Sequence, residues 1–162
     1  MSEREIASAL HRLELLRKIR VRAVMLSVGL HPGQPPLLEY IFAHPDCTQR
    51  EAAEELDVTA PSAAASLKRL EKAGLVRRTA DPQDARCNRL RLTPEGEKRI
   101  LRSREMMDAL DREMTAGLSP ESRALLKDML DKMFDNLADE STRNLTICRL
   151  HNQAHSKNRE EG

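Results

Sequence analysis

The stretch CTQREAAEELDVTAPSAAASLKRLEKAGL, Cys47 to Leu75, decides the fold of this 162-residue chain. Thr48 is a good N-cap for a helix, and Glu51 three residues later completes a capping box. A second helical pattern follows after a short turn. Two short helices joined in this way are typical of a helix-turn-helix.

The second of these helices opens with small side chains. Thr59 or Ala60 precedes Pro61, a residue that suits a first helical turn, and Gly74 is the expected stop. Residues 63–65 are alanines, which form helices well but bury little area, so another surface could come very close. A DNA major groove only about 12 Å wide is such a surface. Hydroxyls that could bond phosphates or base edges belong to Thr59, Ser62 and Ser66.

A basic hairpin is predicted directly after this pair of helices. LVRRT and NRLRL alternate in the manner of strands, and ADPQDA between them has turn chemistry. The hairpin carries five arginines, which are Arg77, Arg78, Arg86, Arg89 and Arg91. A basic hairpin after a helix-turn-helix is a wing.

Longer helices flank this region. Helical spacing of apolar residues predicts helices over 4–27, over QPPLLEYIFAH, over 94–116 and over 120–138. Pro32 can occupy the first turn of the second of these helices. The apolar surface of the last helix is too wide for a lone outer helix and indicates a partner chain. The predicted fold class is therefore mainly α with a small β-hairpin wing. We expect a winged helix-turn-helix lobe at 31–93, a helical dimerisation region at 1–30 and 94–140, and a polar tail at 141–162.

Composition narrows the possible functions. The net charge is +1, but residues 60–104 hold twelve Lys and Arg against five Asp and Glu, whereas residues 105–140 hold four against ten. The basic block could meet a polyanion. Aromatic residues make up 2% of the chain, which argues against modules that stack single-stranded bases.

The chain shows none of the residue motifs that are typical of an active site. It has no Gly-rich phosphate loop, no Ser/His/Asp arrangement and no strong metal triad, so an enzyme is not expected. Three cysteines without a CxxC pair, no signal-peptide pattern in MSEREIASALHRL and no long apolar run predict a cytoplasmic protein without membrane contact.

The sequence resembles the MarR family of winged helix-turn-helix transcription regulators over roughly residues 5–140. The segments that carry the resemblance are LHPGQPPLLEYI, CTQREAAEELDV, LKRLEKAGLVRR, DPQDAR and LRLTPEGE, in the family's order and spacing. The resemblance implies a homodimer joined by its terminal helices, a recognition helix in each major groove of a palindromic double-stranded DNA site, and repression relieved by a small effector, often phenolic or aromatic. No cofactor is implied.

The resemblance also implies roles for individual residues. Arg86 is the wing-tip arginine that enters the minor groove, Asp84 orients it, and Thr48 and Gln49 begin the first helix at phosphates. Many relatives carry a longer polar residue where this chain has alanines, so specificity would lean more on the wing and on DNA shape. The full set of candidate DNA contacts is Thr48, Gln49, Thr59, Ser62, Ala63, Ser66, Lys68, Arg69, Arg77, Arg78, Asp84 and Arg86.

Several alternatives stay open at this point. Arg77 and Arg78 both neighbour phosphates, or one contacts phosphate while the other pairs within the fold. Lys68 and Arg69 could equally be solvated helix charges. A winged-helix module that binds protein instead of DNA is a further possibility.

Cysteine and histidine chemistry offers two more alternatives. Cys47 at a helix start and Cys87 on the wing could sense oxidants in a regulator of the same fold. Cys148, His151 and His155 share one helical face and could hold zinc, although scattered histidines in a polar tail explain them better.

Overall fold

The computed structural model describes residues 2–31, 33–81, 87–145 and 149. Helices dominate, and the elements in chain order are α1 (Glu3–Ser27), α2 (Pro35–Ala43), β1 (Cys47–Thr48), α3 (Gln49–Glu55), α4 (Ala60–Lys72), β2 (Val76–Ala80), β3 (Asn88–Leu92), α5 (Pro94–Met114) and α6 (Pro120–Leu137). The predicted fold class, mainly α with a small wing, is confirmed. Pro32 lies outside the described residues, and α2 begins at Pro35.

Local capping chemistry fixes the ends of the helix-turn-helix. The Thr48 hydroxyl accepts a hydrogen bond from the Glu51 backbone N–H, and the Glu51 carboxylate accepts one from the Thr48 backbone N–H. The Thr59 hydroxyl caps α4 by accepting from the Ser62 backbone N–H. Gly74, with φ of +71°, ends that helix in the left-handed conformation that glycine adopts without strain.

A three-stranded antiparallel sheet has the order β1-β3-β2. The predicted hairpin is β2 with β3, and β1 adds the third strand through pairing of Cys47 with Leu90. One face of the sheet presents Val76, Leu90 and Leu92 to the core. That core joins α1, α2, α4 and the sheet, and its fully buried side chains include Leu30, Leu38, Ile41, Leu67, Leu70, Leu75 and Ile100.

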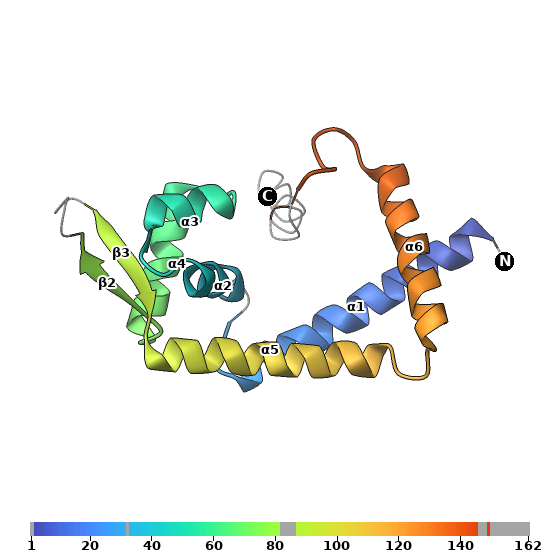
Figure 1. Cartoon of the computed structure of the whole chain (residues 1–162), viewed down its shortest axis with the longest axis horizontal. Helices are drawn as coiled ribbons and strands as arrows, with labels where there is room; N and C mark the ends of the chain where they lie inside the picture. The colour runs from blue at the N-terminus through green and yellow to red at the C-terminus, as the bar shows by residue number, and fades with distance from the viewer. Residues whose placement is uncertain (1, 32, 82–86, 146–148, 150–162) are drawn as a thin grey trace, which may run out of the picture.

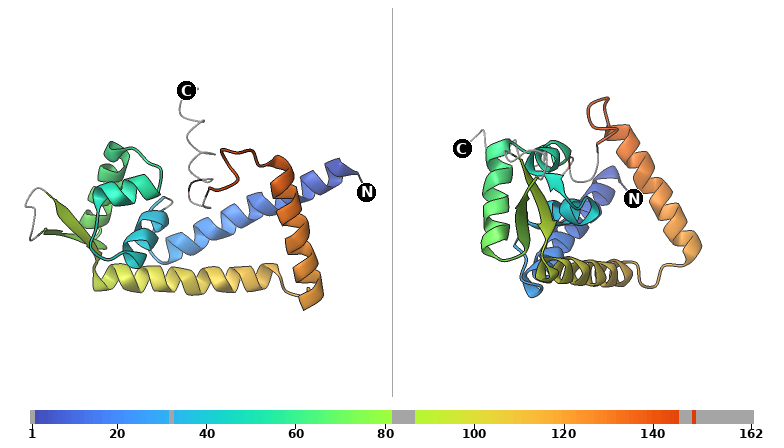
Figure 2. Two further views of the ribbon diagram at one scale, coloured as in Figure 1. Left: turned by 45° about the horizontal axis from the view of Figure 1, so that its top comes forward. Right: turned by 60° about the vertical axis from the view of Figure 1, so that its left-hand side comes forward.

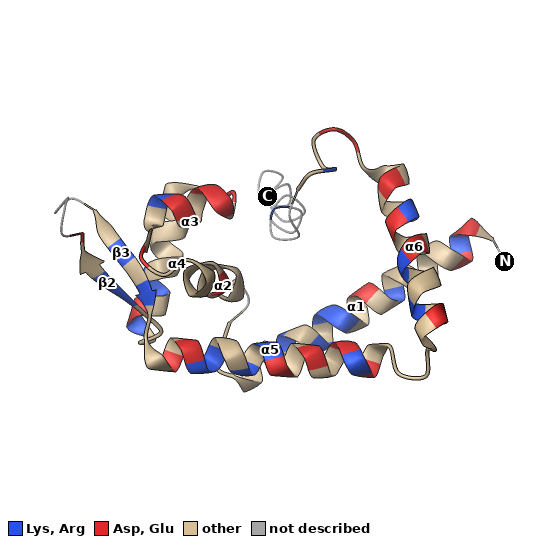
Figure 3. Ribbon diagram, in the orientation of Figure 1, with Lys and Arg blue, Asp and Glu red and all other residues tan. Residues whose placement is uncertain are grey.

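The long helix α5 runs from this lobe to the opposite end of the molecule, and α1 lies beside it (Figure 1). Two ion pairs tie these helices together: Arg17 to Asp111 at 3.3 Å, and Arg20 to Glu113 at 2.8 Å. Acidic and basic side chains alternate along α5 (Figure 3). The helices α1, α5 and α6 therefore occupy the residues expected to form a dimerisation region.

Helix α6 stands away from the lobe in each view (Figure 2) and has no buried residue. Its large apolar side chains are 41–88% exposed, and they are Leu125, Leu126, Met129, Leu130, Phe134 and Leu137. An isolated chain would thus leave a continuous apolar surface in water, which is unfavourable by about 25 cal/mol per Å².

One described residue beyond α6 returns to the lobe. Arg149 donates hydrogen bonds to the backbone carbonyls of Glu54 and Glu55, at 3.3 and 3.1 Å. These carbonyls lie at the C-terminal end of α3, where helical partners are lacking and a cation is favourable. Among the described residues, no helix is both long enough and apolar enough to cross a membrane.

Candidate nucleic-acid interface

Helix α4 has a buried row and an outward row of side chains. Ala63, Leu67 and Leu70 recur at helical spacing and are at most 3% exposed, so they hold the helix against the core. Ala63 was expected among the outward contacts, and the structure instead buries its methyl group inside the lobe. The other side chains of α4 are exposed or half-buried, and they are Ala60, Pro61, Ser62, Ala64, Ala65, Ser66, Lys68, Arg69, Glu71 and Lys72; we call Ser62, Ala64, Ala65, Ser66, Lys68, Arg69 and Lys72 the outward row.

The outward row combines small, hydroxyl and cationic groups. Ser62 and Ser66 lie one turn apart, and the Ser66 hydroxyl accepts a hydrogen bond from the Arg69 guanidinium at 3.0 Å. At the helix start, the Thr59 hydroxyl accepts the capping hydrogen bond from the Ser62 backbone N–H. A surface of this kind could approach another closely while offering donors and positive charge.

At the start of α3, the two predicted contact residues differ in availability. The Thr48 hydroxyl accepts from the Glu51 N–H and donates to the Glu51 carboxylate at 3.0 Å, so it is fully engaged. Hydrogen bonds from the Thr48 backbone N–H and hydroxyl lower the pKa of Glu51. Gln49, in contrast, is half-buried, and its amide nitrogen donates to no residue that the structure describes.

Most of the described arginines of the wing are paired within the fold. Arg78 bonds to Glu71 at 2.7 Å, Arg89 to the buried carboxylate of Asp81, and Arg91 to Asp46. The hydrogen bond from Arg91 lowers the pKa of Asp46. These three partners were not predicted from the sequence.

Arg77 differs from its neighbour Arg78. It is exposed, and it makes no hydrogen bond or ion pair with any residue that the structure describes. Strand alternation explains the difference, because Val76 and Arg78 lie on the inner face of the sheet and Arg77 lies on the outer face. The pattern VRRTA carries that signal once the strand is assigned. Of the two alternatives for this pair, the structure matches the one in which a single arginine pairs internally.

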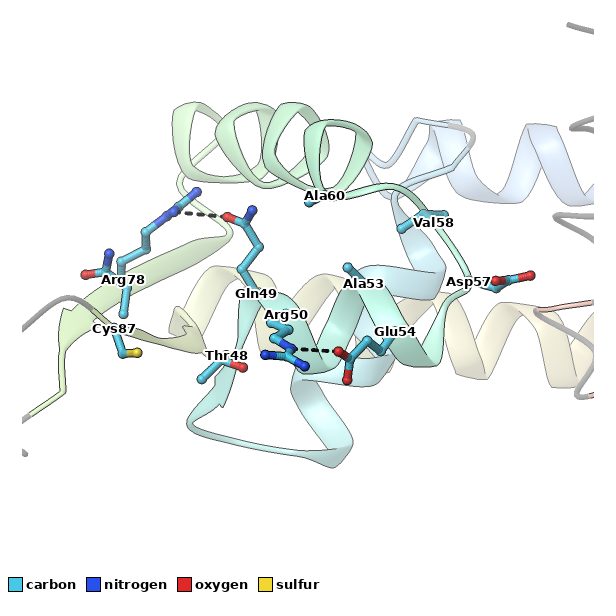
Figure 4. A pocket seen from close by; sticks show the side chains of 11 residues that line it. Thr48, Gln49, Arg50, Ala53, Glu54, Asp57, Val58, Ala60, Arg78 and Cys87 are labelled. Atoms are coloured by element: carbon cyan, nitrogen blue, oxygen red, sulfur yellow. Dashed lines mark hydrogen bonds and ion pairs between the residues drawn. The ribbon is translucent and has the colours of Figure 1, made fainter. Parts of the chain in front are cut away.

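A hollow of about 760 Å³ lies where α3, the start of α4 and the wing meet (Figure 4). Thr48 of β1 and Gln49 and Arg50 of α3 line one side of it, and Arg78 and Cys87 line it from the wing. Ala60 borders it from α4. Both predicted α3 contacts therefore open on one depression beside the outward row of α4.

The two candidate redox cysteines have different environments. Cys47 is 6% exposed, and burial raises the pKa of its thiol to about 11. Because the thiolate is the reactive form, this environment does not favour oxidant sensing at Cys47. Cys87 is half-buried at the edge of the hollow.

Five predicted site residues lie outside the described residues: Asp84, Arg86, Cys148, His151 and His155. Among those that the structure does describe, no group of three or more His, Cys, Asp or Glu side chains could hold a metal ion.

Comparison with known proteins identifies relatives of this chain. Residues 28–86 match the family model described as the MarR family. The Bacillus subtilis (strain 168) protein YdgJ, named an uncharacterized HTH-type transcriptional regulator, is 29% identical over 133 residues, covering 82% of this chain and 81% of YdgJ.

Solved structures agree with this match. MepR of S. aureus, in a crystal structure with DNA, is 25% identical with a TM-score of 0.72, over 82% of this chain and 99% of MepR. The transcriptional repressor CouR, bound to a 23-mer DNA duplex, is 28% identical with a TM-score of 0.65, over 82% of this chain and 97% of CouR. The family resemblance and the winged-helix fold are confirmed, and these relatives are regulators rather than enzymes.

Proposed function

We propose that this chain, whose residues 28–86 match the model of the MarR family, is a homodimeric transcriptional repressor released from a palindromic DNA site by a small effector. In coarser terms it is a DNA-binding transcriptional regulator. The observation that carries the proposal is the outward row of α4, in which small and hydroxyl side chains are followed by Lys68 and Arg69. That row suits entry of α4 into a major groove.

Contacts to the DNA backbone would come from both sides of α4. Gln49 at the start of α3 and Arg77 on the outer face of the wing carry donors that no described residue accepts. By family position, Arg86 at the wing tip would enter the adjacent minor groove and Asp84 would orient it. Phosphate contacts of this kind set register and affinity, while Ser62 and Ser66 face base edges.

A second copy of the chain is the natural cover for α6. Its exposed apolar side chains, together with Leu13, Leu16 and Ile19 on α1, provide the surface that a dimer would bury. Two copies of α4 would then bind half-sites that lie about one turn of the DNA helix, or about 34 Å, apart. Residues 31–93 serve as the DNA-binding lobe, and residues 1–30 and 94–140 join the two copies.

Release from DNA would follow from a change in that spacing. An effector lowers DNA affinity only by the difference between its binding free energies to the two dimer geometries. The family favours a small aromatic or phenolic effector bound between the dimer region and the lobe. Since such a regulator acts on the chromosome, we place it in the cytoplasm, and the repressor CouR among its relatives supports repression.

The deciding experiment is selection of bound duplexes from a random pool by the purified full-length chain. We expect enrichment of a palindrome, a stoichiometry of two chains per duplex, and an affinity that falls steeply with salt. Enrichment of a single half-site would contradict the dimer. Failure to retain any duplex would favour a protein-binding module instead.

A further inference from the structure

A series of side-chain contacts links α4, the wing and α3. The Arg78 guanidinium donates through Nε to Oε1 of Glu71 at 2.7 Å and through Nη1 to Oε1 of Gln49 at 3.3 Å. Glu71 belongs to α4, Arg78 to β2 and Gln49 to α3. Figure 4 shows the Arg78 and Gln49 side chains meeting at one end of the hollow. A single arginine thus joins the three elements of the candidate interface.

The position of Arg78 in the sheet makes this arrangement possible. It lies opposite Leu90 on the inner face, and its side chain is only 29% exposed. Glu71 is 31% exposed, so the ion pair is partly withdrawn from water. The charge of Arg78 is balanced by an acidic partner inside the fold, unlike that of its exposed neighbour Arg77.

This contact also orients the Gln49 amide. A guanidinium offers donors and no acceptor, so it must meet the carbonyl oxygen of the amide rather than the nitrogen. The amide nitrogen then points away from Arg78 with two donors, and no described residue accepts a hydrogen bond from it. Gln49 is one of the residues that line the hollow and is half-buried, so its side chain is not sealed inside the fold.

We propose that Glu71 and Arg78 are positioning residues that hold the Gln49 amide so that it donates to a DNA phosphate, and that Arg78 itself makes no phosphate contact. This inference rests on the proposed function. Arg78 acts through Gln49, and Glu71 fixes the guanidinium by neutralising it and accepting its Nε–H. The arrangement removes Arg78 from the candidate phosphate contacts and adds Glu71 as a residue that matters for affinity.

A double-mutant cycle between Arg78 and Gln49 tests this role. The full-length protein and its variants are titrated against the selected duplex by fluorescence anisotropy at several salt concentrations. Arg78→Gln should weaken binding about tenfold, the loss of one well-placed hydrogen bond. In the Gln49→Ala background, the same substitution should cost less than about twofold, because its target is already gone.

Salt dependence and a conservative variant separate positioning from direct contact. A direct phosphate contact at Arg78 would reduce the slope of log affinity against log salt by about 0.9, whereas positioning leaves the slope as it is in the wild type. Arg78→Lys keeps the charge but not the planar fork, so it should not restore affinity. Arg143→Gln, which removes the same charge in the tail beyond α6, is the matched control and should leave affinity unchanged.

Equal losses in both backgrounds, a shallower slope for Arg78→Gln, or rescue by Arg78→Lys would each overturn the proposal. Thermal melts accompany every variant. If Arg78→Gln does not fold, Arg78→Lys carries the same cycle, because it can keep an ion pair with Glu71. A wild-type chain that binds no duplex refutes the proposed function, and that result is distinct from all of these.

Discussion

Gly96 in α5 lies directly against the backbone carbonyl of Leu75: a Cβ atom at Gly96 would stand 2.1 Å from that oxygen. The same carbonyl accepts a hydrogen bond from the Thr93 N–H at 3.0 Å, and the Thr93 hydroxyl donates to the carbonyl of Gly74 at 2.6 Å. The start of α5 is therefore anchored on the turn that follows α4. This junction couples the lobe to the long helix α5.

Gly96→Ala should destabilise the fold because backbone cannot yield as a flexible side chain would. We expect a loss of about 2–3 kcal/mol and a fall in Tm of roughly 4–12 °C, measured by thermal denaturation. Gly117→Ala is the control, since nothing lies within 4 Å of its Cβ position and only its φ of +82° opposes alanine, at about 1 kcal/mol. Equal melting of the two variants would show that the close contact is unimportant.

Local sequence signals predicted where the helices of the lobe begin and end. The Thr48–Glu51 capping box, the Thr59 cap and the stop at Gly74 each act within a few residues, so the chain encodes them directly. Strand β1 was missed because two residues carry no alternation, and their pairing with β3 spans more than forty positions. Such non-local pairing is settled by the packed core rather than by the strand's own residues.

The candidate site was predicted less completely, and the reasons are again physical. Charge counting gave no partner for Arg89 and Arg91 and left open whether Arg77 or Arg78 pairs within the fold, whereas acidic side chains from other segments pair with Arg78, Arg89 and Arg91. Burial of Ala63 follows from the helical spacing it shares with Leu67 and Leu70, a pattern visible in the sequence. The partners of the arginines could not be read from spacing, because they depend on how distant elements meet.

Lys68 and Arg69 should act as phosphate contacts on the outward row of α4. Lys68→Gln and Arg69→Gln keep helix propensity, and each should reduce the salt slope of DNA binding by about 0.9. Anisotropy titrations over a range of salt give this slope. Arg143→Gln serves as the charge-matched comparison, and a variant slope no different from that control would assign the residue to the solvated surface.

Helix α6 should hold two copies together through the face that bears Leu126, Leu130 and Phe134, which recur every four residues. Leu130→Glu places a charge on this face, so sedimentation should show monomers where the wild type is dimeric. DNA affinity should fall by about a hundredfold or more, since two linked lobes bind far better than one. Ala124→Glu adds a charge on the opposite, exposed face of α6 and should stay dimeric; a dimeric Leu130→Glu protein would place the interface elsewhere.

The buried thiol of Cys47 should make the fold sensitive to alkali and the residue resistant to alkylation. Burial raises its pKa from 9.0 to about 11, so only about one thiol in a thousand is ionised at pH 8. Mass spectrometry after iodoacetamide treatment of the native protein should find Cys87 modified well before Cys47.

The sign of the pH effect follows from the same shift. Above pH 9 the unfolded thiol ionises while the folded one stays neutral, so the free energy of unfolding should fall by up to about 1.4 kcal/mol per pH unit until about pH 11. Cys47→Ala should lack this component when denaturant melts are compared between pH 8 and 10. Native-state modification of Cys47 as fast as that of Cys87 would instead show a reactive thiolate, and it would return oxidant sensing to consideration at the start of α3.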